Sequence, residues 1–249
     1  MMVVRLDEIS QLSGLFGLIT VMIAIFWGCI VLYRAIKSKE KILYFFFLAV
    51  IFTMSPWSSS GFGYLFWLIT GEVFNYYAYI LIGTLGIPIA LISWLKIYFK
   101  TLHTDKSKIV LSLITFISIF YYIYLIYFLF LASNAPIKEL IGIQPKPNDM
   151  EYKGFILIYM AMAVLLSTIT GIDFSLTSIK IKENPIVQWK GRFLLISFIC
   201  FAIGALGDAA FVFNQITLIT FRIFLIISST LYYIGFIMPK WMKKFLSLK

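Results

Sequence analysis

Three ionisable residues, Asp173, Asp208 and Arg222, lie inside long apolar stretches of the sequence. A charge at the centre of a membrane helix costs roughly 2.5–3.5 kcal/mol, so each is a candidate functional residue. Asp208 and Arg222 stand at similar depths, about 22 and 24 Å from the basic ends of their segments at the usual helical rise. We therefore expect them to face each other. The simpler interpretation is a structural ion pair between neighbouring helices, and the alternative is a site that meets a ligand or a proton.

Aromatic residues near this depth are candidates to complete a ligand site. Trp57 ends the second apolar stretch, and Tyr76 and Tyr79 open the third. Together with Asp208 and Arg222 they could line a water-accessible cavity in the outer half of the molecule. The commoner alternative is that such hydroxyls bond nearby backbone carbonyls. Further along, the tyrosines of the fourth stretch surround the whole helix and are expected to make lipid and packing contacts: Tyr121, Tyr122, Tyr124 and Tyr127.

Other kinds of chemistry have few residues to use. The chain has one histidine, His103, in a basic loop, and two cysteines, Cys29 and Cys200, within apolar stretches. That set is too small for the usual zinc, haem or iron–sulfur ligands, so we expect no metal and no cofactor. The sequence has no GxxxxGK[ST], HExxH or GxSxG pattern, so we expect no catalytic residues and no enzyme activity. For Asp173 we expect a lysine or arginine partner at the basic face.

The composition of the chain indicates that lipid surrounds it. The chain is 61% hydrophobic and 13% charged, with a mean hydropathy of +0.96. Soluble domains average about 45–50% apolar and about 25% charged residues, so this chain could not cover its apolar surface in water. The net charge of +10 falls in short segments between apolar stretches. It therefore indicates membrane topology, and we expect no binding to nucleic acid.

The apolar stretches predict the fold. A spanning helix needs about 20 mostly apolar residues. We expect an all-α integral membrane bundle over residues 1–239 with seven spans: 12–33, 42–60, 73–99, 109–132, 154–179, 193–213 and 216–238. The second span runs into Pro56 and a Ser/Gly-rich stretch, so it could break there, with residues 62–69 dipping back as a re-entrant segment. Pro88 is expected to kink the third span.

Lysine and arginine predict the orientation, because they stay on the cytoplasmic side. The first, third and fifth connections and the tail are basic, over residues 34–41, 96–108, 180–192 and 240–249. The opposite side carries Arg5, Lys138, Lys146 and Lys153. Seven crossings with this bias place the N-terminus outside and the C-terminus in the cytoplasm, in the cell (plasma) membrane.

The tail, residues 240–249, mixes lysines with apolar residues. On a helix, Trp241, Met242, Phe245 and Leu246 share one face, which predicts a short interfacial helix. We expect Lys240, Trp241, Lys243 and Lys244 to contact the bilayer surface, with a preference for anionic lipids. The alternative is a docking site for a cytoplasmic partner. Segment 94–100 ends with a similar Trp/Lys pattern, which suggests two three-helix units joined by the fourth helix, a 3+1+3 arrangement used by transporters.

The stretch from Arg34 to Leu102 resembles the front of the seven-helix sensory region at the N-terminus of many prokaryotic histidine kinases. The end, Leu231–Trp241, is similar to the close of such regions. The likeness rests on the basic loop, an aromatic second helix ending near Trp57, and a pattern in the third helix: Tyr79, Gly83, Gly86, Ile87, Pro88, Trp94 and Tyr98. This resemblance implies a sensor. We expect no kinase or other output domain after Lys249, so the resemblance also implies that a signal passes to a separate protein.

We therefore expect a receptor- or sensor-like seven-helix protein that responds to a small or apolar ligand, or to the membrane itself. One alternative is a small 3+1+3 solute transporter similar to the sugar-carrying SWEET family. Against it, the sequence has no PQ-loop motif, no matched proline in each half and no paired broken helices. Another alternative is a non-catalytic structural subunit of a membrane complex.

Overall fold

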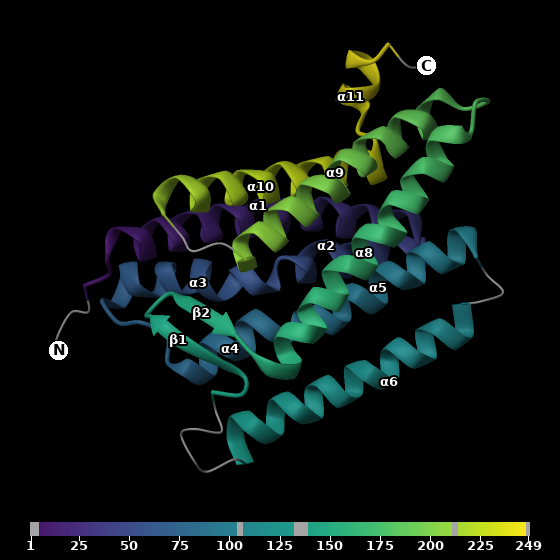
Figure 1. Ribbon diagram of the computed structural model, residues 1–249. Coiled ribbons are helices and arrows are strands. Elements are labelled where there is room, and N and C mark those ends of the chain that lie inside the picture. Colours follow the sequence, from purple (N-terminus) through teal and green to yellow (C-terminus); the bar gives the residue numbers. More distant parts are fainter. Residues whose placement is uncertain (1–4, 104–106, 132–138, 211–213, 248–249) are drawn as a thin grey trace.

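The computed structural model describes residues 5–103, 107–131, 139–210 and 214–247, and it is almost entirely helical (Figure 1). The helices are α1 (Glu8–Ser38), α2 (Lys41–Thr53), α3 (Ser55–Thr70), α4 (Tyr76–Thr84), α5 (Gly86–Leu102), α6 (Ser107–Ile126) with its π-helical continuation η2 (Tyr127–Leu131), α8 (Gly154–Lys180), α9 (Pro185–Ala210), α10 (Gln215–Ile237) and α11 (Lys240–Phe245). A hairpin of two antiparallel strands, β1 (Gly142–Lys146) and β2 (Asp149–Tyr152), precedes α8.

Six helices among the described residues are long and apolar enough to cross a membrane. They are α1, α4 joined to α5, α6 joined to η2, α8, α9 and α10. The pair α2 and α3 passes the same test together, which gives up to seven crossings. The expectation of an all-α, multi-pass membrane protein is confirmed at this level.

The helices pack as a closed ring with one member outside it. α1 packs against α2, α3 and α10; α2 packs against α5; α5 packs against α8; and α9 packs between α8 and α10. α6 lies outside this ring against α5 and α8 (Figure 1). The hairpin lies at one end of the bundle, here called the hairpin end. The opposite end, called the basic end, holds residues 34–41, 96–102, 180–192 and α11.

The second apolar stretch is broken where α2 meets α3. These two helices are bent by 59° at Met54, and Pro56 lies in the first turn of α3. Proline is tolerated in a first turn because the missing N–H would have no helical partner there. The break expected at Pro56 is therefore present two residues earlier, and residues 62–69 lie within α3.

The third stretch is interrupted at Leu85, between α4 and α5. Pro88 cannot donate to the carbonyl of Thr84, four residues earlier, so that carbonyl loses its helical partner. The Tyr121 hydroxyl donates to the Thr84 carbonyl at 3.2 Å, and the Tyr122 hydroxyl donates to the Leu85 carbonyl at 2.7 Å. The expectation that these tyrosines make only lipid and packing contacts was wrong, because two of them satisfy the carbonyls at the interruption.

Small residues bring helices close together. A Cβ on Gly61 of α3 would lie 2.7 Å from the Leu18 backbone nitrogen of α1, so only a glycine permits this approach. A Cβ on Gly86 would collide with the side chains of Ser55 and Phe52. The two interruptions, at Met54 and at Leu85, therefore lie side by side.

Candidate functional site

Asp208 of α9 and Arg222 of α10 face each other as expected. Arg222 Nε lies 3.3 Å from Asp208 Oδ1, and the arginine is only 4% exposed. The start of α10 is fixed by Asn214, whose side chain accepts from the Thr217 N–H while Thr217 bonds back to the Asn214 N–H. This cap sets where α10 begins and so places Arg222 two turns in, opposite α9.

Two further helices contact this ion pair. The Trp57 indole N–H of α3 donates to Asp208 Oδ2 at 2.6 Å. Arg222 Nη2 donates to Ser13 Oγ of α1 at 3.3 Å. Four helices, α1, α3 and the consecutive pair α9 and α10, therefore meet at one pair of opposite charges. Sequence reasoning included Trp57 and missed Ser13, whose one signal is its position on the small-residue face of α1.

Tyr76 and Tyr79 belong to a different set of contacts. The Tyr76 hydroxyl donates to the Gly142 carbonyl at 3.0 Å, and the Tyr79 hydroxyl donates to the Asn148 carbonyl at 3.0 Å. Both acceptors belong to the hairpin. The structure therefore joins Trp57, Asp208 and Arg222 directly, while Tyr76 and Tyr79 attach the hairpin to α4. A role for any of the five in ligand binding stays a prediction.

The tip of the hairpin is inserted into the bundle. Asn148 is 1% exposed, and neither atom of its side-chain amide has a hydrogen-bond partner among the described residues. Gly63 of α3 leaves the room for it, because a Cβ there would lie 2.8 Å from Asn148 Oδ1. Burial raises the pKa of the neighbouring Asp149 carboxyl; the charge of Asp208 raises it further, while Arg222 opposes the shift. The Asp149 carboxyl at the hairpin tip is therefore near enough to the ion pair for both of its charges to act on it.

The end of β1, next to the turn of the hairpin, is tied to the start of α1. Lys146 Nζ lies 2.6 Å from Asp7 Oδ2, on the surface. This hydrogen bond is the main reason that the pKa of Asp7 falls to about 2, and its bonds with Ser10 add to the shift. Asp7 also caps α1, since its Oδ1 accepts from the Ser10 N–H at 3.0 Å. One carboxylate thus holds both elements together.

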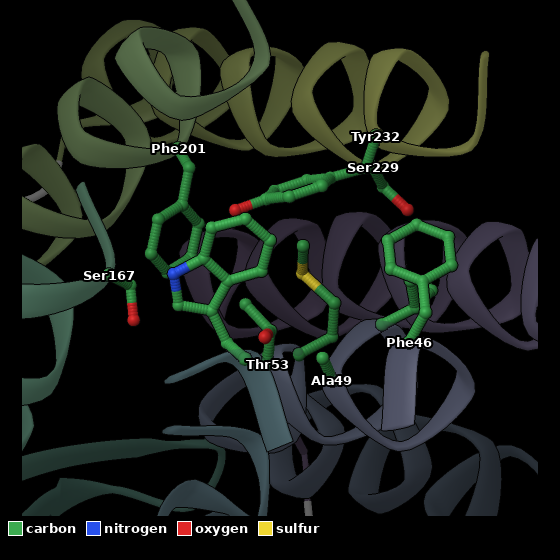
Figure 2. A pocket seen from close by; sticks show the side chains of 10 residues that line it. Phe46, Ala49, Thr53, Ser167, Phe201, Ser229 and Tyr232 are labelled. Atoms are coloured by element: carbon green, nitrogen blue, oxygen red, sulfur yellow. The ribbon is translucent and has the colours of Figure 1, made fainter. Parts of the chain in front are cut away.

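A small cavity lies deeper in the bundle, beside the bend between α2 and α3 (Figure 2). Its volume is about 20 Å³, enough for roughly one water molecule. Aromatic rings and hydroxyl groups line it: Phe46, Ala49, Val50, Thr53, Met54, Trp94, Ser167, Phe201, Ser229 and Tyr232. A solute larger than water would therefore require the helices to move.

Asp173 has other partners than those expected. The Tyr98 hydroxyl donates to Asp173 Oδ2 at 2.7 Å, and His103 Nε2 lies 3.7 Å from the same oxygen. Among the described residues, no lysine or arginine nitrogen lies within 4 Å of this carboxylate. Among the described residues, the partners are therefore not the expected lysine or arginine, because α5 brings its own tyrosine and the histidine after it to this face of α8; Lys106 lies outside the described residues.

The tail forms helix α11. Two of its apolar residues pack against the bundle and two point away from it. Met242 is buried and Leu246 is partly buried against the bundle, while Trp241 is 54% and Phe245 is 80% exposed. The expectation of one shared membrane face was wrong in this respect, because residues 242 and 246 pack on the protein. Lys240 and Lys244 are exposed and Lys243 is half-buried. Residues 248–249 of the predicted tail lie outside the described residues.

In the part of the chain that the structure describes, no three His, Cys, Asp or Glu side chains are grouped so that they could hold a metal ion. Comparisons with protein-family models, with curated proteins and with solved structures found no match. The geometry of the ion pair and of the hairpin above it is therefore the ground on which a function is proposed.

Proposed function

We propose that this chain is a receptor- or sensor-like membrane protein whose responsive part is the Asp208–Arg222 pair together with the hairpin over it. The observation that carries the proposal is the burial of unsatisfied polar groups under this hairpin. Arg222 Nη1 and both amide atoms of Asn148 are buried without hydrogen-bond partners among the described residues. A change at this end would pass through the helices to a separate partner protein at the basic end.

The free energy of the buried polar atoms under the hairpin favours a hairpin that can change its position. A buried polar atom without a partner costs about 1–3 kcal/mol, so the closed hairpin lies above the energy of a fully satisfied arrangement. A polar ligand, or a shifted hairpin, would recover part of that free energy. Two arrangements a few kcal/mol apart are what a ligand can select between. The same groups in a purely structural ion pair would be expected to have satisfied partners.

The proposed topology has seven crossings, with α2 and α3 together forming one bent span. The membrane would be the plasma membrane of the cell. The hairpin end and the N-terminus would lie outside, and the basic end would lie in the cytoplasm. The gathering of basic residues at one end of the bundle supports this orientation through the positive-inside rule. No catalytic role and no cofactor are part of the proposal.

The test uses the full chain in lipid nanodiscs and a panel of small polar and amphiphilic molecules. We expect at least one compound to raise the melting temperature of the wild type and to lose that effect in Asn148→Ala. The matched control, Asp173→Asn, removes a carboxylate at the other end and should respond as the wild type does. If every stabilising compound acts equally on the wild type and on Asn148→Ala, the hairpin and the Asp208–Arg222 pair do not form a ligand site.

A small solute transporter is the second candidate, and one observation favours it. Two interrupted helices meet where Gly86 packs on Ser55, beside the small cavity. Transporters place substrate sites at helix interruptions near the middle of the membrane. Both interruptions lie in the first half of the chain, so they are not a matched pair with one broken helix in each half. Uptake of solutes into proteoliposomes above that into empty vesicles would support this candidate; the 3+1+3 repeat itself stays a prediction.

A structural subunit of a membrane complex is the third candidate function. In that case, purification from the native membrane in mild detergent would yield a stoichiometric complex. The variant Asn148→Ala would then affect assembly of that complex, and no compound would change the melting temperature.

A further inference from the structure

Three half-buried cations converge at the basic end of the bundle. Arg34 belongs to the last turns of α1, Lys190 to the second turn of α9, and Lys243 to α11. The charges that act on the Lys190 ammonium are those of Lys243 and Arg34, which repel it, and of Glu40, which attracts it. Three separate elements thus bring like charges together around one lysine.

These three cations have no close carboxylate partner among the described residues. Within the described ranges, no carboxylate oxygen lies within 4 Å of Arg34, Lys190 or Lys243. By contrast, Arg192 lies over the Trp189 ring at 4.6 Å, and Lys96 lies over the Phe45 ring at 4.2 Å. Like charges in a partly desolvated place repel each other more strongly than in water, so a bound anion would stabilise this arrangement.

The packing of α11 brings Lys243 to this place. The helix begins after Pro239 and is held to the bundle by Met242 and Leu246, one helical turn apart. Lys243 follows directly after the buried Met242 and is itself half-buried, whereas Lys240 and Lys244 are exposed. Figure 1 shows α11 at the end of the bundle where α8 ends and α9 begins. The position of Lys243 is therefore fixed by apolar contacts and not by a carboxylate.

We propose that Arg34, Lys190 and Lys243 form a binding site for a phosphate group, presented by the headgroup of an anionic lipid. A guanidinium pairs with phosphate oxygens through two parallel hydrogen bonds, and two ammonium groups supply further charge-assisted donors. Trp241 and Phe245 are exposed on α11 beside this site, and such side chains lie at the boundary between headgroups and acyl chains. They place the three cations at headgroup depth.

This site is separate from the ion pair and the hairpin, so it stands or falls independently of the proposed sensor function. It requires only that the helices cross a membrane. A preference for phosphate at the basic end would hold for a sensor, a transporter or a subunit alike.

The experiment is native mass spectrometry of the full chain in zwitterionic detergent at about 0.15 M salt, where distant exposed charges are largely screened. Phosphatidylglycerol and phosphatidylcholine are titrated separately, and glycerol 3-phosphate and inorganic phosphate serve as soluble competitors. The site variant is Arg34→Gln/Lys190→Gln/Lys243→Gln. The control variant removes three exposed charges of the same end, Lys37→Gln/Lys240→Gln/Lys244→Gln.

The wild type and the control variant should bind one phosphatidylglycerol in preference to phosphatidylcholine. The site variant should bind it at least about tenfold more weakly, since each basic residue near a charged headgroup contributes roughly a fivefold change in affinity. Lys190→Gln alone should weaken binding, and Lys190→Arg should retain it, which gives a readout if the triple variant does not fold. Competition by soluble phosphate would support the phosphate site and identify a free anion as a second source. Equal binding of both lipids, or equal loss in the site and control variants, would overturn the proposal.

Discussion

Arg222 has two neighbours of unequal strength. The carboxylate of Asp208 carries a full opposite charge at 3.3 Å, while the Ser13 hydroxyl is a neutral partner at the long limit of a hydrogen bond. In a low-dielectric interior the charge pair dominates, because Coulomb interactions there are several-fold stronger than in water. Trp57 then fixes the second oxygen of Asp208. The position of the pair is therefore set chiefly by α9 and α3.

The pair leads to a prediction at the residue scale. Asp208→Asn or Arg222→Gln alone should destabilise the protein by about 3–5 kcal/mol, because each leaves one charge buried without its partner. The double variant should cost clearly less than the sum of the two single variants. Unfolding of the purified protein in mixed micelles measures all four corners of this cycle. Additive costs would mean that the two charges do not interact.

The interruption at Leu85 gives a second residue-scale prediction. Tyr121→Phe removes the hydroxyl that satisfies the Thr84 carbonyl, and Tyr122→Phe does the same at Leu85. Each variant should lose about 0.5–1.5 kcal/mol, with the larger loss at the fully buried Tyr121. Tyr127→Phe is the matched control on the same helical stretch, since Tyr127 is exposed and should change stability by less than about 0.5 kcal/mol. The same micelle unfolding assay applies, and equal effects in all three variants would contradict the assignment.

At the scale of elements, the hairpin is held by contacts of different kinds. Tyr76 and Tyr79 bond its backbone from α4, and Lys146 pairs with Asp7 at the start of α1. The first two contacts are partly or fully buried, and the third lies in water, where an ion pair contributes little. The Lys146–Asp7 contact should therefore break first, and the contacts with Tyr76 and Tyr79 should break last.

The contact with Asp7 has a defined pH dependence. The pKa of this carboxyl is lowered from 3.8 to about 2, so its contribution to stability is fully present above pH 3.8 and is lost as the pH falls through 2. Because both partners are more than one-third exposed, that contribution should be about 0.2–1 kcal/mol. Asp7→Asn keeps a good helix cap while removing the charge. The difference in free energy of unfolding between the wild type and this variant should be measurable at pH 6 and vanish as the pH falls below about 2.

The tip of the hairpin can be displaced without changing any charge. In Gly63→Ala the new methyl group would meet Asn148 Oδ1 at 2.8 Å, so the hairpin tip must shift. Hydrogen exchange of the amides of residues 142–152 should become faster at neutral pH. In an Asn148→Ala background the collision is absent, and Gly63→Ala should instead stabilise α3 by up to about 1 kcal/mol through helix propensity. Unchanged exchange in Gly63→Ala would mean that the tip is not seated against α3.

At the scale of the whole molecule, the arrangement of basic residues can be tested directly. In a Cys29→Ala/Cys200→Ala background, Glu151→Cys places a thiol on the exposed part of the hairpin and Ser247→Cys places one after α11. A membrane-impermeant maleimide added to intact cells should label Cys at the first position and reach the second only after permeabilisation. The reverse pattern would mean that the bundle is inserted the other way round.

Hydropathy alone predicted the long apolar helices, because a helix that crosses a membrane must be apolar over most of its length. The interruptions were anticipated at Pro56 and Pro88, yet they lie at Met54 and Leu85. A proline removes a hydrogen bond to the residue four positions earlier, so the distortion appears on its N-terminal side. The depth argument also brought Asp208 and Arg222 together.

The hairpin and its contacts could not be predicted in the same way. Residues 142–152 are short and contain two prolines, so they carry a weak strand signal in isolation. Their structure depends on hydroxyl groups of α4 and on the space above Gly63, which come from distant parts of the chain. Asn148 and Ser13 became visible as site residues only once those segments were packed together.

α1 runs from the hairpin end to the basic end as one uninterrupted helix of 31 residues, about 46 Å long. Near its start, Asp7 contacts the hairpin and Ser13 contacts Arg222; near its end stands Arg34, beside Lys190. A helix cannot be shortened or lengthened without breaking its own backbone hydrogen bonds, so axial movement at one end must appear at the other. A displacement of α1 along its axis by one ångström at the hairpin end would therefore move the Arg34 guanidinium at the basic end by a comparable distance.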